Sequence, residues 1–188
     1  MRIFAAPVLA LAATAAQAQA PTPAPAAATA APAPKPAPEL QKLAFLVGDW
    51  VHEETVAPGP MGPGGPRKGR SKAQWILGEH HLYVNYVSRD AANQTLEARG
   101  LLGWDPEKKA YRMGWYDNMG TAVQYQGDFT PEGTLVLNAE YALQGKPVKE
   151  QLSIQKQEGG KVVFTSSQLG ADGTMKAVLE SVATAEKK

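Results

Sequence analysis

The sequence contains no cysteine, and this absence excludes several classes of protein. A chain without thiols has no disulfide framework, no thiolate metal site, no cysteine nucleophile and no cysteine for lipid attachment. Histidine is also scarce, because the only three are His52, His80 and His81. Adjacent residues on a strand point to opposite faces, so His80 and His81 cannot both reach one metal ion that needs three or four ligands. We therefore expect no metal site and no cofactor.

Net charge is nearly absent too, with a formal value of +1 at pH 7. A neutral chain argues against nucleic acid or an anionic membrane as the main partner. The basic residues Arg67, Lys68, Arg70 and Lys72 form a local cluster without interleaved aromatic residues. Such a run favours a solvated loop over a binding patch. The sequence also lacks the Gly-x-Ser-x-Gly motif of a serine hydrolase.

Long apolar runs are missing after the first residues of the chain. The opening stretch, MRIFAAPVLALAATAAQAQA, combines one positive charge at Arg2, an Ala- and Leu-rich run and small residues before Ala18. This pattern predicts a secretory signal peptide over residues 1–18, and with it a periplasmic or secreted protein. The run is shorter than the roughly 20 apolar residues of a membrane-spanning helix, so we expect no membrane insertion.

The residues that follow divide into a spacer and one domain. Residues 19–38 alternate alanine and proline, which favours a semi-rigid polyproline II linker roughly 60 Å long. A passive tether is the favoured interpretation, although this linker is also a candidate ligand for a partner. Residues 39–188 are long enough for one domain to bury its own core, and we expect a monomer.

From Trp50 onward the chain consists of short runs of alternating character, separated by Gly, Pro, Asn and Asp. This pattern predicts about ten strands joined by short hairpin turns. No later stretch repeats apolar residues at a helical period, so crossover helices and parallel pairing are not expected. An antiparallel up-and-down sheet of this size leaves exposed edges unless it closes into a barrel. The long Gly- and Pro-rich connection at residues 57–70 is expected to lie over one barrel mouth.

A short helix is expected just before the first strand, because Leu43, Leu46 and Val47 fall at helical spacing. The next residues include Gly48 and Trp50, which resemble the Gly-x-Trp signature of lipocalin-like, or calycin, barrels. Longer segments are similar to the bacterial family catalogued as domain of unknown function 1579: LAFLVGDW, WILGEHHLYVNY, RGLLGWDPEKKAYRMGWYDNMGT and GKPVKEQLSIQ.

This resemblance extends from about Leu40 to the end of the chain and implies a fold but no mechanism. It implies an all-β, antiparallel, up-and-down lipocalin-like barrel in which Trp50 plugs the closed end and the preceding helix covers it. In lipocalins a basic side chain of the last strand stacks on this tryptophan, and Lys176 is the candidate here.

Strand alternation assigns the more apolar set of side chains on each strand to the barrel interior. On this basis Leu77, Met175, Ala177 and Leu179 point inward. The interior is then apolar and aromatic with a few polar groups, the usual composition of a small-molecule site. We expect a small hydrophobic molecule to bind there, against the following residues: His52, Trp75, Tyr86, Tyr111, Trp115, Asp117, Tyr125 and Glu150.

The polar members of this set leave alternatives open. His52, Asp117 and Glu150 either orient a ligand or satisfy one another as a buried network. Asp117 is also compatible with a tight turn, in which Asn118 and Gly120 adopt positive φ and the carboxylate accepts turn amides.

Binding is therefore the favoured function, with two alternatives. One is an enzyme of isomerase or hydrolase type that uses Asp117 and Glu150 as acid and base. The other is a cell-envelope interaction module whose barrel is filled by its own side chains.

Overall fold

The computed structural model describes residues 34–59 and 62–187. The predicted signal peptide and most of the predicted linker lie outside the described residues. Residues 34–37 have no regular structure, and Nε2 of His80 lies 3.1 Å from the backbone oxygen of Pro34. None of the helices in the described ranges is long and apolar enough to cross a membrane.

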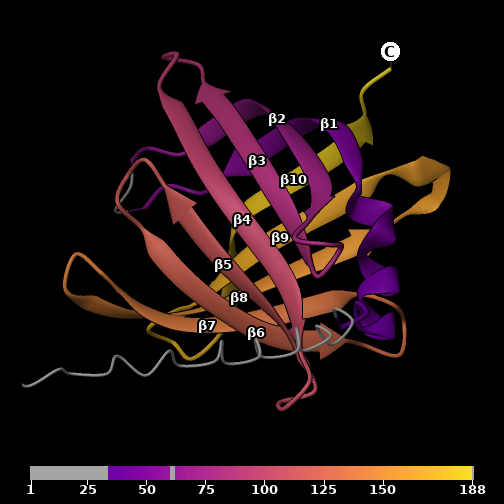
Figure 1. Ribbon diagram of the computed structural model, residues 1–188. Helices are drawn as coiled ribbons and strands as arrows, with labels where there is room; N and C mark the ends of the chain where they lie inside the picture. Colours follow the sequence, from indigo (N-terminus) through magenta and orange to yellow (C-terminus); the bar gives the residue numbers. More distant parts are fainter. Residues whose placement is uncertain (1–33, 60–61, 188) are drawn as a thin grey trace, which may run out of the picture. The chain divides into compact units, whose positions relative to one another are not determined.

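The chain forms a closed antiparallel barrel in which each strand pairs with its neighbours in sequence and the last pairs with the first (Figure 1). This arrangement confirms the predicted all-β, up-and-down barrel. Its elements are η1 (Pro38–Leu46), β1 (Gly48–Val56), β2 (Gly65–Ile76), β3 (His81–Asp90), β4 (Thr95–Asp105), β5 (Ala110–Asp117), β6 (Ala122–Phe129), β7 (Leu135–Leu143), β8 (Lys146–Lys156), η2 (Glu158–Gly160), β9 (Val162–Leu169) and β10 (Met175–Ala185).

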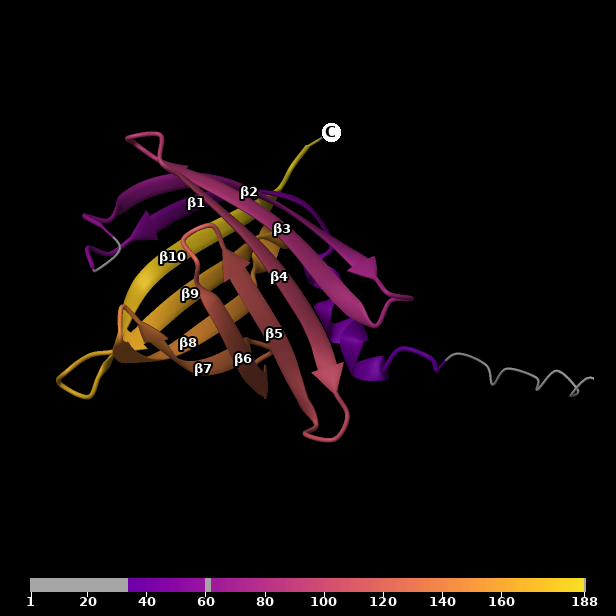
Figure 2. The same cartoon turned by 60° about the vertical axis from the view of Figure 1, so that its left-hand side comes forward.

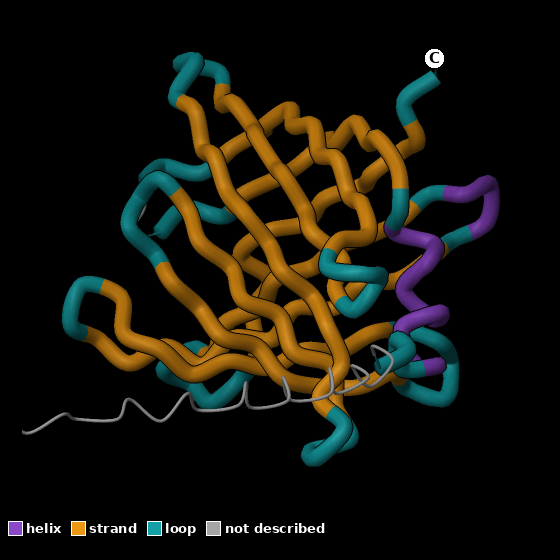
Figure 3. Tube along the Cα trace, viewed as in Figure 1, coloured by secondary structure: helices purple, strands orange, loops and turns teal. Residues whose placement is uncertain are grey.

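The segment expected to be a short helix winds as the 3₁₀ turns of η1 (Figure 3). A 3₁₀ helix has three residues per turn, so every third side chain lies on one face. Leu40, Leu43 and Leu46 have this spacing and are all buried, whereas Val47 is exposed. The expected grouping of Val47 with Leu43 and Leu46 is therefore wrong, because the chain winds more tightly than an α-helix.

Trp50, near the start of β1, is buried. Figure 2 shows η1 at the end of the barrel where β1 begins, which is the closed end. The indole Nε1 of Trp50 donates a hydrogen bond of 2.8 Å to the backbone oxygen of Leu46. The hydroxyl of Tyr111, from the opposite wall, donates to the backbone oxygen of Glu39 at 2.7 Å. These two bonds fasten η1 to the barrel, and the apolar core gathers around them: Leu40, Leu43, Leu46, Leu82, Leu102, Leu135, Leu137, Ile154 and Val162.

Lys176 does not stack on Trp50, so the expectation drawn from lipocalins is wrong. The residue of β10 that pairs with Trp50 is Ala185, ten positions from the start of that strand. Lys176 lies at the other end of β10, where its Nζ is 2.7 Å from Oδ2 of Asp172 in the β9–β10 turn. The indole is held by a backbone carbonyl instead of a cation.

The open end carries the β1–β2, β3–β4, β5–β6, β7–β8 and β9–β10 connections (Figures 1 and 2). The first of these was expected to extend through Arg70, but β2 already begins at Gly65. Arg67, Lys68 and Arg70 are therefore strand residues paired with β1 and β3, not a solvated loop. Pairing prevails here because Gly65–Arg70 completes the ladder opposite Val51–Val56.

Alternation predicted most inward positions but failed at two strand ends. Leu77 is exposed, because it lies in the β2–β3 turn with φ 52°. Met175 and Ala177 are also exposed, since a β-bulge shifts the register of β10 between Ala177 and Leu179. An extra residue in one strand reverses the faces of everything on one side of it. Leu179 and the positions after it keep the expected orientation.

One seam of the barrel is short. β6 and β7 pair only from Gln126 to Phe129 and from Leu135 to Asn138. Gly127 lies in this seam, where an added Cβ would be 1.8 Å from the backbone oxygen of Val136. Glycine is thus required for the two strands to approach. Toward the open end, the first residues of β6 and the last residues of β7 are not paired with each other.

Candidate functional site

The barrel interior changes from apolar to polar between its closed and open ends. Two groups of buried and partly buried polar side chains lie on different parts of the wall. The first, which we call the Glu54 cluster, is carried by β1, β2, β3 and β10: His52, Glu54, Arg67, Ser71, Tyr86, Ser88 and Ser181. The second, the Glu150 cluster, is carried by β6, β7, β8 and β9: Tyr125, Tyr141, Glu150, Ser166 and Gln168.

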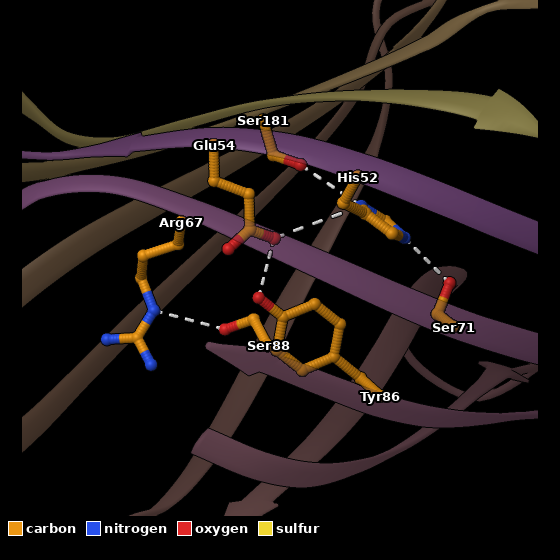
Figure 4. A network of polar contacts seen from close by, with 7 residues as sticks. All are labelled: His52, Glu54, Arg67, Ser71, Tyr86, Ser88 and Ser181. Carbon is orange, nitrogen blue, oxygen red and sulfur yellow. Dashed lines mark hydrogen bonds and ion pairs between the residues drawn. The ribbon is translucent and has the colours of Figure 1, made fainter. Parts of the chain in front are cut away.

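Figure 4 shows the side chains of the Glu54 cluster, which strand alternation brings to one face. Trp50, His52 and Glu54 are alternate residues of β1 and are all buried. Gly69 lies on the neighbouring strand, where an added Cβ would be 3.2 Å from Oε1 of Glu54 and 3.1 Å from Cβ of Ser88. The missing side chain leaves room for the carboxyl group against the wall.

His52 is held by two serines of neighbouring strands. Its Nδ1 is 3.0 Å from Oγ of Ser181, and its Nε2 is 2.8 Å from Oγ of Ser71. Burial lowers the pKa of His52 to about 4, so the ring is neutral at pH 7. A neutral imidazole has one donor and one acceptor, and both are occupied by these hydroxyl groups. His52 therefore has no free nitrogen for another group.

Glu54 has one satisfied oxygen and one bare oxygen. Oε1 accepts a hydrogen bond of 2.6 Å from the hydroxyl of Tyr86. Oε1 also lies 4.0 Å from Nδ1 of His52, but a neutral ring makes this a contact and not an ion pair. Among the described residues Oε2 has no hydrogen-bond partner, although the side chain is only 1% exposed.

Burial sets the ionisation of this pair. It raises the pKa of Glu54, while the hydrogen bond from Tyr86 and the charge of Arg67 act in the opposite direction. Burial and then the neighbouring carboxyl of Glu54 raise the pKa of Tyr86, so its hydroxyl keeps the proton that it donates. Arg67 itself donates from Nε to Oγ of Ser88 at 3.1 Å and from Nη2 to the backbone oxygen of Gln94 at 3.4 Å.

Glu150 is surrounded by neutral donors. Oε1 accepts from the hydroxyls of Tyr125 and Ser166, each at 2.8 Å. Oε2 accepts from the hydroxyl of Tyr141 at 2.5 Å and from Nε2 of Gln168 at 3.2 Å. Burial, followed in Tyr125 by the charge of Glu150, raises the pKa of both phenols. Both oxygens of this carboxyl group are thus satisfied without a basic side chain.

An aromatic wall connects these polar groups to the core. The rings of Tyr86 and Trp115 have centroids 5.7 Å apart, as do those of His52 and Phe164. Gly100 makes room for Trp115, since an added Cβ would lie 3.2 Å from Cε3 of the indole.

Several apolar side chains on inward positions of this wall stay partly exposed, namely Val84, Trp115, Leu152 and Phe164. Solvent therefore reaches the inner face of the barrel. Many other inward positions of the strands carry small residues: Gly69, Ser71, Ala73, Ser88, Ala98, Gly100, Ala139, Ser166, Ser181 and Ala183. Small side chains thus line much of the inner face of this ring of ten strands.

Two hollows open on the surface of the barrel. One, of about 360 Å³, lies over Gly103, Gly114 and Tyr116, on the outer face of β4 and β5. The other, of about 370 Å³, lies beside Glu150 and includes the exposed side chains of Leu169 and Met175. Neither hollow is lined by a residue of the Glu54 cluster.

Five of the predicted site residues lie in this interior: His52, Tyr86, Trp115, Tyr125 and Glu150. Tyr111 lies in the core of the closed end, bonded to Glu39. Trp75 pairs with Leu82 of β3 and packs against the same core. The structure thus brings together the polar and aromatic groups of the open half and leaves these two residues beneath them.

Asp117 belongs to the β5–β6 turn, as the alternative interpretation of the sequence held. Its Oδ1 accepts hydrogen bonds of 3.0 Å from the backbone N–H groups of Met119 and Thr121. Gly120 has a positive φ of 84°, but Asn118 does not, so that part of the prediction is wrong. The side chain of Asn118 instead bridges to β4, accepting from the N–H of Glu97 and donating to the backbone oxygen of Thr95.

Sequence reasoning missed most of the Glu54 cluster as candidate site residues. Glu54 and Ser88 continue the inward alternation of His52 and Tyr86, so parity alone was enough to find them. Ser181 similarly follows Leu179. Ser71 has the parity of Trp75 in the strand expected to begin at Ser71, so the same signal applied to it. Arg67 had no such signal, because it was expected to lie in the connection before that strand. Within the described ranges, no group of three or more histidine, aspartate or glutamate residues is arranged to hold a metal ion.

Two solved structures share this fold. Rv2717c from M. tuberculosis has a TM-score of 0.58 and 13% identity, and the match covers 81% of this chain and 100% of that chain. The S-type phycobiliprotein lyase CPES from Guillardia theta has a TM-score of 0.53 and 11% identity, and the match covers 81% of this chain and 99% of that chain. At these identities the likeness concerns the barrel alone. No curated protein matches the chain in sequence.

A family model described as "Protein of unknown function (DUF1579)" matches residues 35–184, a range that begins just before η1 and ends within β10. Since this range contains nearly the whole barrel, the chain belongs to the DUF1579 family of proteins of unknown function.

Proposed function

We propose that the barrel binds a small, largely apolar molecule in the open half of its interior. The observation that carries the proposal is the partly exposed aromatic wall around Trp115 and Phe164, which lies between two buried carboxyl groups. Apolar lining with a few fixed polar groups is the composition of small-molecule sites.

The position of the polar groups supports this function. Both clusters lie above the packed core, on the side away from η1, where a molecule entering from the open end reaches them first. Their own hydrogen bonds hold His52, Tyr86 and Glu150 in place before any ligand arrives. Groups that are held in advance lose little conformational entropy when a ligand binds.

The two solved structures share the barrel fold with this chain, but the proposal does not depend on them. One of them is named as a phycobiliprotein lyase, and its likeness to this chain is in the barrel. For this chain we propose binding as the function, because its interior supplies both apolar contact surface and polar anchors.

The proposal is tested with the neutral fluorescent probe N-phenyl-1-naphthylamine. We expect its emission to rise on titration with the protein and to be reversed by competing apolar molecules. Trp115→Ala removes part of the inner wall and should weaken the binding of the probe. Tyr116→Ala is the matched control, since Tyr116 is the next residue and lies exposed on the outer face. Equal probe binding by both variants, or no binding by the native protein, would contradict the proposal.

We also propose that the protein is exported, on the basis of its first 18 residues. The expected mature N-terminus is Gln19, and N-terminal sequencing of protein from its own host checks this. A mature chain that still begins at Met1 would exclude cleavage.

A further inference from the structure

The bare oxygen of Glu54 requires a partner that the described chain does not supply. Oε2 is buried, and leaving a buried charged or polar group unsatisfied costs more than a typical hydrogen bond gains. Nearly all buried polar groups in native proteins are paired, so this exception calls for an explanation. Tyr86 bonds the other oxygen, Oε1, and Arg67 donates to Ser88. The hydroxyls of Ser88 and Ser181 lie near enough to lower the pKa of Glu54, but neither makes a hydrogen bond to Oε2.

His52 is not the missing donor. Its two nitrogens are occupied by Ser71 and Ser181, and burial keeps it neutral at pH 7. An interaction with Oε2 would require the ring to leave both serines. Oε2 of Glu54 is thus a buried acceptor without a hydrogen-bond partner among the described residues (Figure 4).

The fixed charges of the interior favour one kind of ligand. Two carboxyl groups, Glu54 and Glu150, are buried in the wall. By register two basic residues also lie on the inner face near the mouth, Arg67 opposite Glu54 and Lys176 opposite Gln168. Arg67 is bonded to Ser88 and Gln94, and Lys176 is paired with Asp172. The hydrogen bonds of Arg67 go to neutral groups, so its charge acts on Glu54, whose pKa it lowers. A ligand carboxylate beside Glu54 would therefore meet a like charge and would compete with Glu54 for the same cation.

We propose that the bound molecule carries a hydrogen-bond donor head, an ammonium or other N–H group, which Oε2 of Glu54 accepts. Its apolar body would then lie along the aromatic wall of Tyr86 and Trp115. This inference rests on the proposed function and names the chemical class of ligand for the same site. A cationic head returns to Glu54 the stabilisation that burial removes from its charged form.

The test compares three probes of equal chain length, octylammonium, 1-octanol and octanoate, by isothermal titration calorimetry at pH 7.5. Equal chains make the apolar contribution the same, so differences in affinity report the head group. We expect octylammonium to bind about tenfold or more tightly than octanoate, with octanol between them, as suits a hydrogen bond to a charged group. Octanoate binding as tightly as octylammonium would overturn the inference and point to Arg67 as an anion site.

Two variants assign the preference to one carboxyl group. Glu54→Gln should remove most of the advantage of octylammonium over octanol, while the binding of octanol changes little. Glu53→Gln is the matched control, because Glu53 is the preceding residue and is exposed on the outer face. Circular dichroism melting shows whether each variant folds, and Glu54→Asp gives a second reading if the glutamine variant does not. An unchanged preference in folded Glu54→Gln would contradict the role of Glu54.

Lower pH provides an independent check. As Glu54 takes up a proton, the advantage of octylammonium over octanol should shrink. The ionisable groups facing it are His52 from β1, Arg67 from β2 and Tyr86 from β3, while β10 contributes Ser181, which does not titrate.

Failure of the inference differs from failure of the proposed function: binding of N-phenyl-1-naphthylamine without a preference among the three octyl probes overturns the inference alone. Binding of none of these molecules overturns both.

Discussion

The hydroxyl of Tyr86 donates a hydrogen bond of 2.6 Å to Oε1 of Glu54, and this bond joins β3 to β1 across the intervening strand β2. The contact is possible because the strand between them presents Gly69 at the same level. A buried carboxyl group is thereby fixed on one oxygen and left open on the other. Because this bond joins two strands, it should also stabilise the folded barrel.

Tyr86→Phe should destabilise the barrel by about 1–3 kcal/mol, since it leaves both oxygens of a buried carboxyl group without a donor. Urea unfolding measures the difference. Tyr83→Phe is the control, because Tyr83 lies on the same strand but has the opposite orientation. Equal stability of Tyr86→Phe and the native protein would show that another donor takes over.

His52 should make the stability of the fold depend on pH. Its pKa is about 4 in the folded protein and near 6.5 when unfolded, so between these values the unfolded chain binds more protons. Stability from this group is therefore complete above about pH 6.5 and falls by up to about 3 kcal/mol as the pH drops to 4.

The comparison of native protein with His52→Gln at pH 7 and pH 4.5 isolates this effect. The raised pKa of Glu54 acts in the opposite direction, because its folded form binds a proton more readily, but Glu54 is present in both proteins. His80→Asn, in the turn before β3, is the control. Identical pH dependence in the native protein and His52→Gln would mean that His52 is solvated.

Trp50→Ala should lower the free energy of unfolding by about 3–5 kcal/mol, because it empties the closed end of the barrel. Trp50→Phe keeps an aromatic ring but loses the bond to Leu46, and a smaller loss is expected. Chemical denaturation gives both values. An alanine variant as stable as the native protein would remove the role of Trp50 as a plug.

Gly127→Ala should be among the most damaging small substitutions, since its Cβ would lie 1.8 Å from a backbone oxygen of β7. Overpacking typically costs about 1–3 kcal/mol, and a contact with backbone does not relax by side-chain rotation. Gly59→Ala is the control, with no atom within 4 Å of the added Cβ. Similar melting temperatures for the two variants would show that the β6–β7 seam adjusts freely.

The sequence was sufficient to predict the barrel because its signals are local and repeated. Alternation and turn residues recur in every strand, and the up-and-down order follows from the short connections. The 3₁₀ winding of η1 had weaker signals, although the spacing of Leu40, Leu43 and Leu46 was present in the sequence. The bulge in β10 has no sequence marker at all, so the positions of Met175 and Ala177 were not predictable.

The site was predictable only in part, for a physical reason. Parity shows which face a side chain occupies, and it placed His52, Tyr86 and Glu150 correctly inside. It does not show which residues of distant strands meet. The pairing of Glu150 with Tyr125 and of His52 with Ser181 depends on strand stagger and closure, which are properties of the whole barrel.

The most direct test of the central claim is native mass spectrometry of the protein purified gently from its own host, followed by denaturation and identification of what is released. The account predicts one small molecule per chain, largely apolar and carrying an N–H donor. A barrel that is empty, with a structure in which side chains fill the space beside Trp115, would contradict it.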